Sequence, residues 1–535
     1  MSDYSQQGFL DECEREQLHR AQAIQPCGAL LGGERGDPRV RFASANLLEW
    51  LGTSAEAVLG RPLTEVVIEF PPPASQDASL RLATAGASLP GAERWMHVDG
   101  EPSLYRDLLL GSRGSLDARL AGHDRHWILE LQPALPEDRR HQAYRPIPHR
   151  LYHTPYTQAD WVELCQFLVD TLREASGFDR VMLYRFREDD CGEVISESLI
   201  DGLSPYLGLR YPASDIPRIA RDLYRVNRHR QIPDVAAVPV PILGLHGAEL
   251  DMTRSDLRAV SPVHLQYLRN MEVTASLSFS LVLFGRLWGL IACHHRAPRS
   301  LPLAVRERCA EMAQVFTLSI AGYQNNRRLQ DVSGSDRDIS RLMDVIRKTA
   351  AARHARRAGE PTPNLAPRLG QALLSLVRAE GAALVTAREI MTFGITPDHE
   401  SIATQITWLR AHAQDLVFAS DALPQCCPPA EPWSDRASGL LAVRLGRPEQ
   451  PWSEGERFFL WWRPEQPRTV YWAGDPGKTV RSDSVDDRLS PRSSFERWVE
   501  IASGYAEPWS EIDLLRAKKF RNLILRDLDP RLFDR

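Results

Sequence analysis

The sequence predicts an α+β protein of three domains joined by long helices, and three observations lead to this class. The chain has 535 residues, a length that corresponds to three or four domains of roughly 150 residues each. Hydrophobic residues make up 43% of it and charged residues 25%, a composition typical of globular proteins that excludes a disordered or collagen-like chain. Short alternating apolar runs recur between stretches with helical apolar spacing, so strands and helices are mixed in each part.

Charge and cysteine spacing exclude further classes. Lys and Arg total 65 against 70 Asp and Glu, a formal charge of -5, so we expect no general nucleic-acid or membrane polycation. The longest apolar runs are far shorter than the roughly 20 residues of a membrane span, and the N-terminus has no signal-peptide pattern. The eight cysteines contain no Cys-x-x-Cys pair, so we expect no zinc site and no disulfide framework. A cytoplasmic location is expected.

Two domains precede residue 325. After a polar segment at 1–20, a first domain at 21–135 is indicated by short β-like runs between Gly- and Pro-containing turns, and the proline-rich stretch 133–148 is expected to be a connector. A second domain at 150–325 contains a helix ended by Gly177, a strand, a hairpin with its turn at Gly285 and a long amphipathic helix. The predicted ranges of these elements are 159–176, 180–186, 275–281 with 287–292, and 305 to beyond 325.

A third domain is predicted at 330–510, followed by a last helix over 511–528. The segment 472–495 within it is turn-rich, charged and poor in core residues. Long irregular segments in compact domains are usually functional or disordered.

No enzyme signature is present. The sequence lacks a phosphate-binding Gly-x-x-x-x-Gly-Lys-Ser/Thr loop, a Gly-x-Ser-x-Gly elbow and a His-Glu-x-x-His motif. His294 and His295 are adjacent, so on a strand they face opposite sides and cannot bind one metal ion together. We therefore expect neither catalysis nor a metal site in this chain.

The segment 211–217, Tyr-Pro-Ala-Ser-Asp-Ile-Pro, is the most informative one. Its two prolines hold the residues before them in extended conformations. The backbone carbonyl of Asp215 is then expected to accept hydrogen bonds, and its carboxylate is expected to be free of helix packing. The alternative is a simple turn before a helix at 218–230.

A second informative segment covers 257–271. A helix can begin at Pro262 with Ser261 as its N-cap, and His264 and Tyr267 then lie on one face of it. The alternative for His264 is a buried structural histidine.

Together these segments resemble the phytochrome family and, within it, the bacteriophytochromes. The resemblance covers nearly the whole chain in the order PAS, GAF, PHY. The motifs are Ser214-Asp215-Ile216-Pro217, the helix 258–271, the strand 288–295, the N-terminal Cys13 to Glu16 with 23–28, and the two arms of the family's "tongue" hairpin, 472–474 and 491–495.

The resemblance implies a fold in which each domain is an antiparallel sheet with flanking helices. The expected parts are an N-terminal extension 1–20 that is knotted with the GAF domain, PAS 21–135, GAF 150–325, PHY 330–510 with the tongue at about 465–500, and a C-terminal output-linker helix 511–535. The tongue residues implied are Trp472, Gly474, Pro491, Arg492, Ser494 and Phe495.

The resemblance also implies a linear tetrapyrrole ligand with two propionates, which suit arginine side chains. Arg230 and Arg258 match those positions, with Ser261 as a further donor, and Asp215 and His264 match the acceptors for pyrrole N–H groups. The pocket around the terminal ring D matches Tyr184, Tyr211 and Tyr267 on its aromatic side and Ser276, Ser278 and His294 on its polar side. The remaining implied contacts are Ile216, Pro217 and Tyr224.

The attachment site implies which bilin is bound. Val263 stands where plant and cyanobacterial members carry the attaching cysteine, whereas Cys13 matches the cysteine of the bacterial type. Biliverdin IXα, held by a covalent thioether, is therefore implied. The alternative for Cys13 is an idle thiol. The sequence departs from the family pattern at two positions. Cys27 is a second thiol where the family often has histidine. Glu272 stands where glycine usually ends the helix, so the helix is expected to end in another way.

The function implied is a bistable red/far-red switch. Isomerisation of the bond before ring D would change the partners of His294, the tyrosines and Asp215, and loss of an Arg492–Asp215 pair would let the tongue refold.

Expected partners are the bilin, a second copy of the chain and an output domain or response regulator, without nucleic acid or membrane. Nothing between 514 and 535 resembles a kinase, although the full-length protein could be a sensor histidine kinase. The alternative is a light-independent PAS–GAF sensor of a small molecule, or a relative that has lost its pigment.

Overall fold

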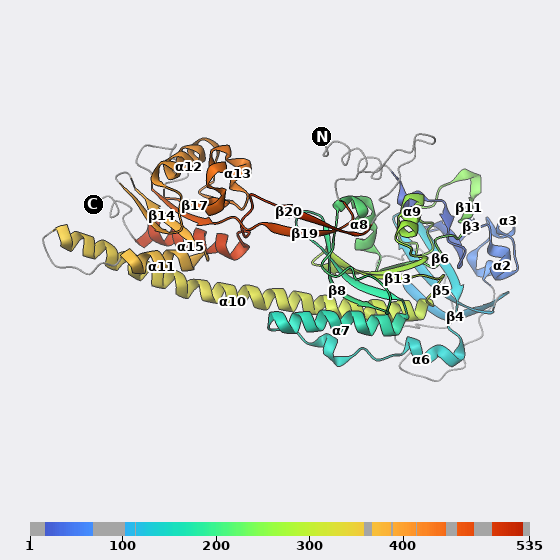
Figure 1. Ribbon diagram of the computed structural model, residues 1–535. Coiled ribbons are helices and arrows are strands. Elements are labelled where there is room, and N and C mark those ends of the chain that lie inside the picture. Colours follow the sequence, from blue (N-terminus) through green and yellow to red (C-terminus); the bar gives the residue numbers. More distant parts are fainter. Residues whose placement is uncertain are drawn as a thin grey trace. The chain divides into compact units, whose positions relative to one another are not determined.

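The computed structural model describes residues 16–67, 102–112, 114–357, 366–386, 389–413, 415–445, 457–475 and 495–527. The predictions for Cys13, Pro491, Arg492 and Ser494 lie outside these residues. The chain divides into two compact units (Figure 1). The first comprises Met1–Tyr323 and Tyr471–Trp498, and the second comprises Gln324–Val470 and Val499–Arg535.

The first sheet has the strand order β1-β11-β3-β2-β6-β5-β4, with antiparallel pairing throughout. Its strands are β1 Ala23–Ile24, β2 Ala29–Glu34, β3 Phe42–Ser44, β4 Ser103–Gly111, β5 Gly114–His123, β6 His126–Pro133 and β11 Val240–Gly244. The short helices α2 Leu47–Leu51, α3 Ala55–Val58 and α4 Leu63–Val66 belong to the same domain. Buried Leu31, Trp50 and Trp127 are part of its core.

One strand of this sheet, β11, comes from the GAF part of the sequence. It lies between β1 and β3, with Ile24 opposite Val240 and Ile242 opposite Ser44. The N-terminal segment is therefore bound directly to a segment more than two hundred residues later. The knot implied by the resemblance stays a prediction.

The second sheet has the order β10-β12-β13-β7-β8-β9-β19-β20. Its strands are β7 Arg180–Phe186, β8 Gly192–Leu199, β9 Arg210–Tyr211, β10 His229–Ile232, β12 Ala275–Leu283, β13 Arg286–His295, β19 Arg468–Ala473 and β20 Arg497–Ala502. The pairs from β10 to β9 are antiparallel, whereas β9 and β19 pair in parallel, with Trp472 opposite Arg210. The start of the predicted tongue thus continues the GAF sheet.

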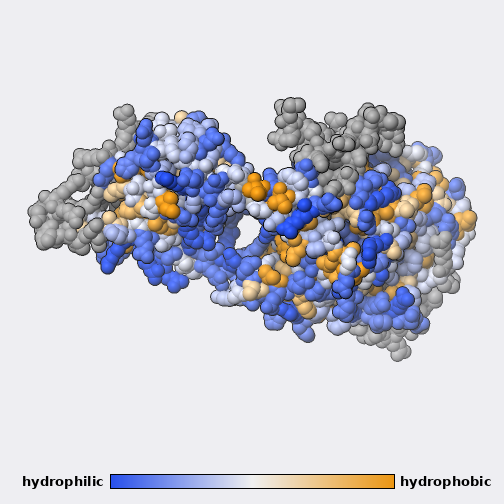
Figure 2. Space-filling view, in the orientation of Figure 1, coloured by the Kyte–Doolittle hydropathy of each residue, from blue (hydrophilic) through white to orange (hydrophobic). Residues whose placement is uncertain are grey.

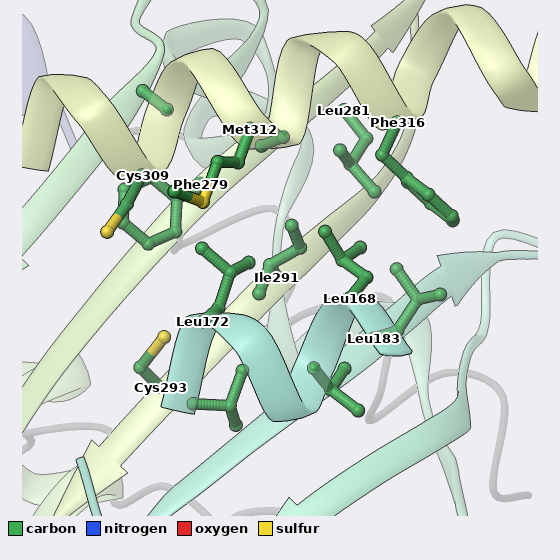
Figure 3. Packing of buried hydrophobic residues seen from close by; sticks show 14 of the residues in the cluster. Leu168, Leu172, Leu183, Phe279, Leu281, Ile291, Cys293, Cys309, Met312 and Phe316 are labelled. Atoms are coloured by element: carbon green, nitrogen blue, oxygen red, sulfur yellow. The ribbon is translucent and has the colours of Figure 1, made fainter. Parts of the chain in front are cut away.

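Two long helices pack on this sheet. Helix α7, Gln158–Ser176, begins with a capping box of Thr157 and Asp160 and ends at Gly177, whose φ of 65° is left-handed. Helix α10, Leu303–Arg357, is 55 residues long. Figure 3 shows side chains of α7, of β7, β12 and β13 and of the first part of α10 meeting in one apolar layer, among them Leu172, Phe279, Ile291 and Phe316. Both helices agree with the predictions from apolar spacing.

The segment before Arg230 differs from the prediction. Helix α8 covers Arg218–Val226 and not 218–230. Asn227 has extended backbone angles, and its side chain donates hydrogen bonds to the carbonyls of Leu223 and Thr253. The chain then pairs with β12, where Arg230 lies opposite Ser278. Because the sheet edge offers backbone partners, Arg230 is on a strand.

Smaller elements complete the first unit. They are α6 Arg140–Ala143, α9 Pro262–Asn270 and the 3₁₀ turns Leu18–Arg20, Glu137–Arg139, His149–Tyr152, Ala213–Asp215 and Leu245–Gly247. The β12–β13 hairpin turns at Phe284 and Gly285, which both have positive φ, as a type I′ turn requires.

The second unit contains an antiparallel sheet of order β15-β14-β18-β17-β16. Its strands are β14 Gly381–Val385, β15 Ile390–Gly394, β16 Val417–Ser420, β17 Gly439–Arg444 and β18 Phe458–Arg463. Its other elements are α11 Ala366–Leu376, α12 His399–His412, α13 Leu423–Cys426, α14 Ser434–Ala437, the 3₁₀ turn Pro428–Trp433 and α15 Glu511–Asp527. Helix α15 agrees with the predicted last helix.

The surface of the first unit seen in Figure 2 mixes hydrophilic residues with scattered hydrophobic ones. Among the described residues, no helix has both the length and the apolar character needed to cross a bilayer.

Candidate functional site

A cavity of about 250 Å³ lies in the first unit among α8, α9, the central strands of the second sheet and the loop 212–217. Leu18 and Glu16 of the N-terminal segment also line it. All fourteen described residues predicted to contact a ligand line this one cavity: Tyr184, Tyr211, Asp215, Ile216, Pro217, Tyr224, Arg230, Arg258, Ser261, His264, Tyr267, Ser276, Ser278 and His294.

The loop on one side of the cavity is held by an arginine that sequence reasoning missed. Arg221 of α8 donates hydrogen bonds to the carbonyl oxygens of Ile216 (2.7 Å) and Ala213 (3.3 Å), and to the carboxylate of Asp190 (2.7 Å). The sequence feature that could have indicated this role is the position of Arg221 in the first turn of α8. There it lies close to loop carbonyl oxygens that need hydrogen-bond donors.

The prediction that the Asp215 carboxylate is free of helix packing is wrong. Its Oδ2 accepts a hydrogen bond of 2.8 Å from the hydroxyl of Tyr267 on α9. The face of α9 that carries Tyr267 also carries His264, whose ring stacks on that of Tyr267 at a centroid distance of 6.1 Å. The carboxylate is therefore fixed by the helix that it faces.

Ser261 occupies the predicted N-cap position of α9, but its side chain makes no cap hydrogen bond. Its hydroxyl donates to Oε2 of Glu16 at 2.8 Å instead. This hydrogen bond joins the N-terminal segment to the cavity wall. Sequence reasoning also missed this contact.

Two arginines, the buried Arg258 and the partly buried Arg230, form a positive region in the cavity wall. The guanidinium of Arg230 donates hydrogen bonds to the carbonyl oxygens of Asp256, Arg258 and Ala259. That of Arg258 donates to the carbonyl oxygens of Met252 and Thr253. Burial, followed by the charge of Arg230, lowers the pKa of Arg258 to about 9. Two guanidinium groups that destabilise each other here would gain from a bound carboxylate.

The two cavity histidines are neutral at pH 7. Burial, followed by the charge of Arg230, lowers the pKa of His264 to about 4. Burial, followed by Arg180 and His264, lowers the pKa of His294 to about 3. A neutral imidazole has one donor and one acceptor nitrogen, so both residues can bind a ligand N–H or carbonyl. His295 lies on the opposite side of β13, with Nδ1 3.1 Å from Asp179, as the alternation of the strand predicts.

Aromatic and hydroxyl groups form the remaining wall. The rings of Tyr184 and Tyr211 lie 5.8 Å apart, and burial raises the pKa of Tyr211 well above its usual value. Ser278 donates a hydrogen bond to the hydroxyl of Tyr224 at 3.2 Å. Phe495, at the end of the predicted tongue, packs edge-on against Tyr267 at 5.0 Å, and the amide of Gly474 donates to the carbonyl of Glu496.

The two departures from the family pattern have clear structural settings. Burial raises the pKa of the Cys27 thiol to about 11, so little of it is a reactive thiolate at neutral pH. Glu272 has a φ of 58°, and the amides of Glu272 and Val273 donate to the carbonyls of Arg269 and Leu268. This is the Schellman ending that glycine usually provides. The prediction that α9 must end in another way is wrong.

Family models match three regions of the chain: a PAS fold at 13–84, a GAF domain at 160–322 and the phytochrome region at 347–530. The bacteriophytochrome of Xanthomonas campestris pv. campestris is 34% identical over 96% of this chain and 78% of that protein. The bacteriophytochrome of Pseudomonas aeruginosa and cyanobacterial phytochrome B of Nostoc sp. are each 33% identical over 96% of this chain. This chain spans 66%, about two thirds, of the length of these last two.

Solved structures agree with these matches. A bacteriophytochrome from the photosynthetic bacterium R. palustris aligns with a TM-score of 0.74 and 31% identity over 96% of this chain and 98% of that chain. The Stigmatella aurantiaca phytochrome photosensory core module aligns with a TM-score of 0.73 and 31% identity over 96% of this chain and 97% of that chain. The chain therefore belongs to the phytochrome family and forms a photosensory core of its PAS, GAF and PHY regions.

Proposed function

We propose that this chain is the light-sensing part of a red/far-red photoreceptor that binds biliverdin IXα in the cavity and attaches it to Cys13. The observation that carries the proposal is the convergence of fourteen sequence-predicted residues on one cavity with two arginines in its wall. The family supports a bilin, and the absence of a nucleophile at Val263 supports attachment through the N-terminal segment.

The residues present fit such a pigment. When bound, a bilin supplies light absorption and isomerisation of the bond before ring D. Arg230 and Arg258 would hold the propionates through charge-assisted hydrogen bonds. Further polar partners would be Ser261, Ser276 and Ser278. Neutral His264 and the carbonyl of Asp215 would accept pyrrole N–H groups. Tyr184, Tyr211 and His294 would surround the ring that turns.

The signal would leave the cavity through the tongue. Tyr267 touches both Asp215 and Phe495. A structural change at Asp215 would therefore reach the end of the tongue through this one side chain. The pairing of Arg492 with Asp215 would make this connection dependent on the state of the pigment. A segment with few large apolar residues can change its packing at a small difference in free energy.

A pigment-binding experiment tests the proposal. Purified protein is mixed with biliverdin and run on a denaturing gel, where zinc-induced fluorescence marks a covalent adduct. We expect the adduct in the wild type and in Cys27→Ala, the control thiol, but not in Cys13→Ala. Red and far-red light should then interconvert two absorption spectra. Protein that stays colourless, or that takes up colour which light cannot change, would instead support a light-independent sensor or a pigment-lost relative.

The wider assignments follow from the same proposal. A cytoplasmic homodimer that acts on an output module or response regulator is proposed for the full-length protein. We propose no catalytic activity for this chain alone, since its matched regions are sensory domains.

A further inference from the structure

Glu130 is a fully buried carboxylate on β6 of the PAS sheet, and it reaches the GAF segment that precedes Arg258 and whose carbonyl oxygens accept from Arg230. We infer that Glu130 is a positioning residue that sets the geometry of Arg258 and Arg230 from outside the cavity. This inference rests on the proposed function, because the arginines matter only if they hold a pigment.

The carboxylate of Glu130 accepts four hydrogen bonds. Its Oε1 accepts from the hydroxyl of Ser255 (2.6 Å) and the amide of Leu257 (2.8 Å). Its Oε2 accepts from the amide of Asp256 (3.1 Å) and from Nη1 of Arg119 (3.0 Å). Three consecutive residues are thus held by one side chain. A shorter side chain would not reach these partners, and a neutral amide of the same length would offer one acceptor oxygen in place of two.

The held segment leads directly into the arginine pair. Arg258 follows Leu257, so its backbone position depends on the segment. Arg230 uses the carbonyl oxygens of Asp256 (2.6 Å) and Arg258 as acceptors, so its guanidinium follows the same backbone. The other side of the segment is fixed by the N-terminal residues, because the amide of Gln25 donates to the carbonyl of Leu257 at 2.7 Å.

The second carboxylate of this arrangement, Asp256, is surrounded by cationic groups. Asp256 lies within 3.5–3.6 Å of Arg119, His229 and Arg306. Burial alone would raise the pKa of Asp256, but these three groups lower it to about 2. Glu130 accepts one of its four hydrogen bonds from the guanidinium of Arg119, and a carboxylate binds such a donor more strongly than a neutral amide does.

Glu130→Gln in the full chain tests the inference. Glutamine has one acceptor oxygen and one NH₂ group. Two of the four groups that donate to Glu130 would then face the NH₂ group, which cannot accept a hydrogen bond from them. We expect hydrogen exchange at the amides of Asp256 and Leu257 to rise by at least about tenfold. We also expect biliverdin attachment to slow by about tenfold or more and the red absorption band to weaken relative to the near-ultraviolet band.

Glu197→Gln is the matched control. Glu197 is also buried, accepts hydrogen bonds from two successive amides, those of Tyr206 and Leu207, and pairs with Arg180 at 3.4 Å. It holds a loop that does not carry the cavity arginines. It should show comparable destabilisation with unchanged exchange at Asp256 and Leu257 and a smaller effect on attachment.

Two results would overturn the inference: unchanged exchange at 256 and 257 in Glu130→Gln, or attachment kinetics equal to those of the control. If Glu130→Gln does not fold because the buried Arg119 loses one of its two carboxylate partners, the double variant Glu130→Gln/Arg119→Met removes that charge. It should recover stability but keep the slow attachment, and recovery of both would show a merely structural role. A wild type that takes up no pigment would defeat the proposed function, while the exchange measurement, which needs no pigment, still tests whether Glu130 fixes the segment.

Discussion

The hydroxyl of Tyr267 donates a hydrogen bond to Oδ2 of Asp215 at 2.8 Å, and the same ring packs against Phe495. One tyrosine therefore touches both the loop that faces the cavity and Phe495, at the end of the predicted tongue. Light-driven changes around Asp215 would have a direct route to the tongue through this contact.

Asp215→Ala should leave pigment attachment intact but impair photoconversion, because the loop would lose the acceptor that links it to α9. Arg492→Ala should do the same. The measurement is the red-minus-far-red difference spectrum at equal pigment content. Asp222→Ala, at an exposed position on α8, is the control and should convert like the wild type. Difference spectra of wild-type size from both Asp215→Ala and Arg492→Ala would contradict the proposed route.

Glu272→Gly should stabilise the protein by about 0.5–1 kcal/mol, because a left-handed conformation costs a non-glycine residue about 1–2 kcal/mol and glycine gives back part of this through its unfolded-state entropy. The measurement is the change in denaturation midpoint. Glu249→Gly, at an exposed glutamate without positive φ, should not stabilise. A lower midpoint for Glu272→Gly would show that its side chain makes a contact worth more than the strain.

Acid should destabilise the pigment-free first unit through its two cavity histidines, His264 and His294. Their pKa values of about 4 and about 3 lie below the usual 6.5, so below pH 6.5 the unfolded chain binds protons that the folded chain does not. The free energy of unfolding should fall by about 1.4 kcal/mol per pH unit for each histidine as pH decreases from 6.5 toward 4.

Denaturant midpoints between pH 7 and pH 4.5 measure this dependence. His264→Gln should reduce the slope of the free energy of unfolding against pH by about 1.4 kcal/mol per pH unit, the contribution of one proton. His412→Gln, at an exposed position on α12, should leave it unchanged. Equal slopes for the wild type and His264→Gln would mean that His264 is protonated in the folded protein.

The second unit should depend strongly on Arg463 at the end of β18. Its guanidinium donates to the carbonyls of Val377 and Pro508 and to the carboxylate of Asp513 at 3.1 Å, and it stacks on the ring of Trp509. Arg463→Leu would leave the buried Asp513 without its main cation, which typically costs 3–5 kcal/mol.

The melting transition of the second unit measures this loss. Arg436→Leu, whose ion pair with Asp435 is exposed, should change stability by less than about 0.5 kcal/mol. A comparably small loss for Arg463→Leu would show that the hydroxyl of Ser510 and the guanidinium of Arg378, which also contact Asp513, suffice to stabilise its carboxylate.

The sequence predicted those features that depend on local spacing. The helix 158–176, the strand 180–186 and the hairpin at Gly285 were found because apolar periodicity and turn residues determine them directly. The convergence of the cavity residues was found only through the family resemblance, since residues from Tyr184 to His294 share no local pattern.

The errors lie where distant parts of the chain compete with local preference. Helix α8 ends early because β12 offers Arg230 a strand partner. The Ser261 hydroxyl turns to Glu16, which is distant in sequence. Asp215 meets Tyr267 through the fold alone, and Glu272 accepts a strained conformation because the Schellman bonds of α9 require it. None of these partners can be read from neighbouring residues.

The pairing of β1 with β11 also sets an order of events during synthesis. At about 5–20 residues per second, Ile24 leaves the ribosome on the order of 10–40 s before its partner Val240 exists. Throughout that interval the first strand has no partner strand, and Glu16 has no Ser261 from which to accept its hydrogen bond. Under the proposed attachment at Cys13, thioether formation would report that translation has passed β11 and that this strand pair has formed.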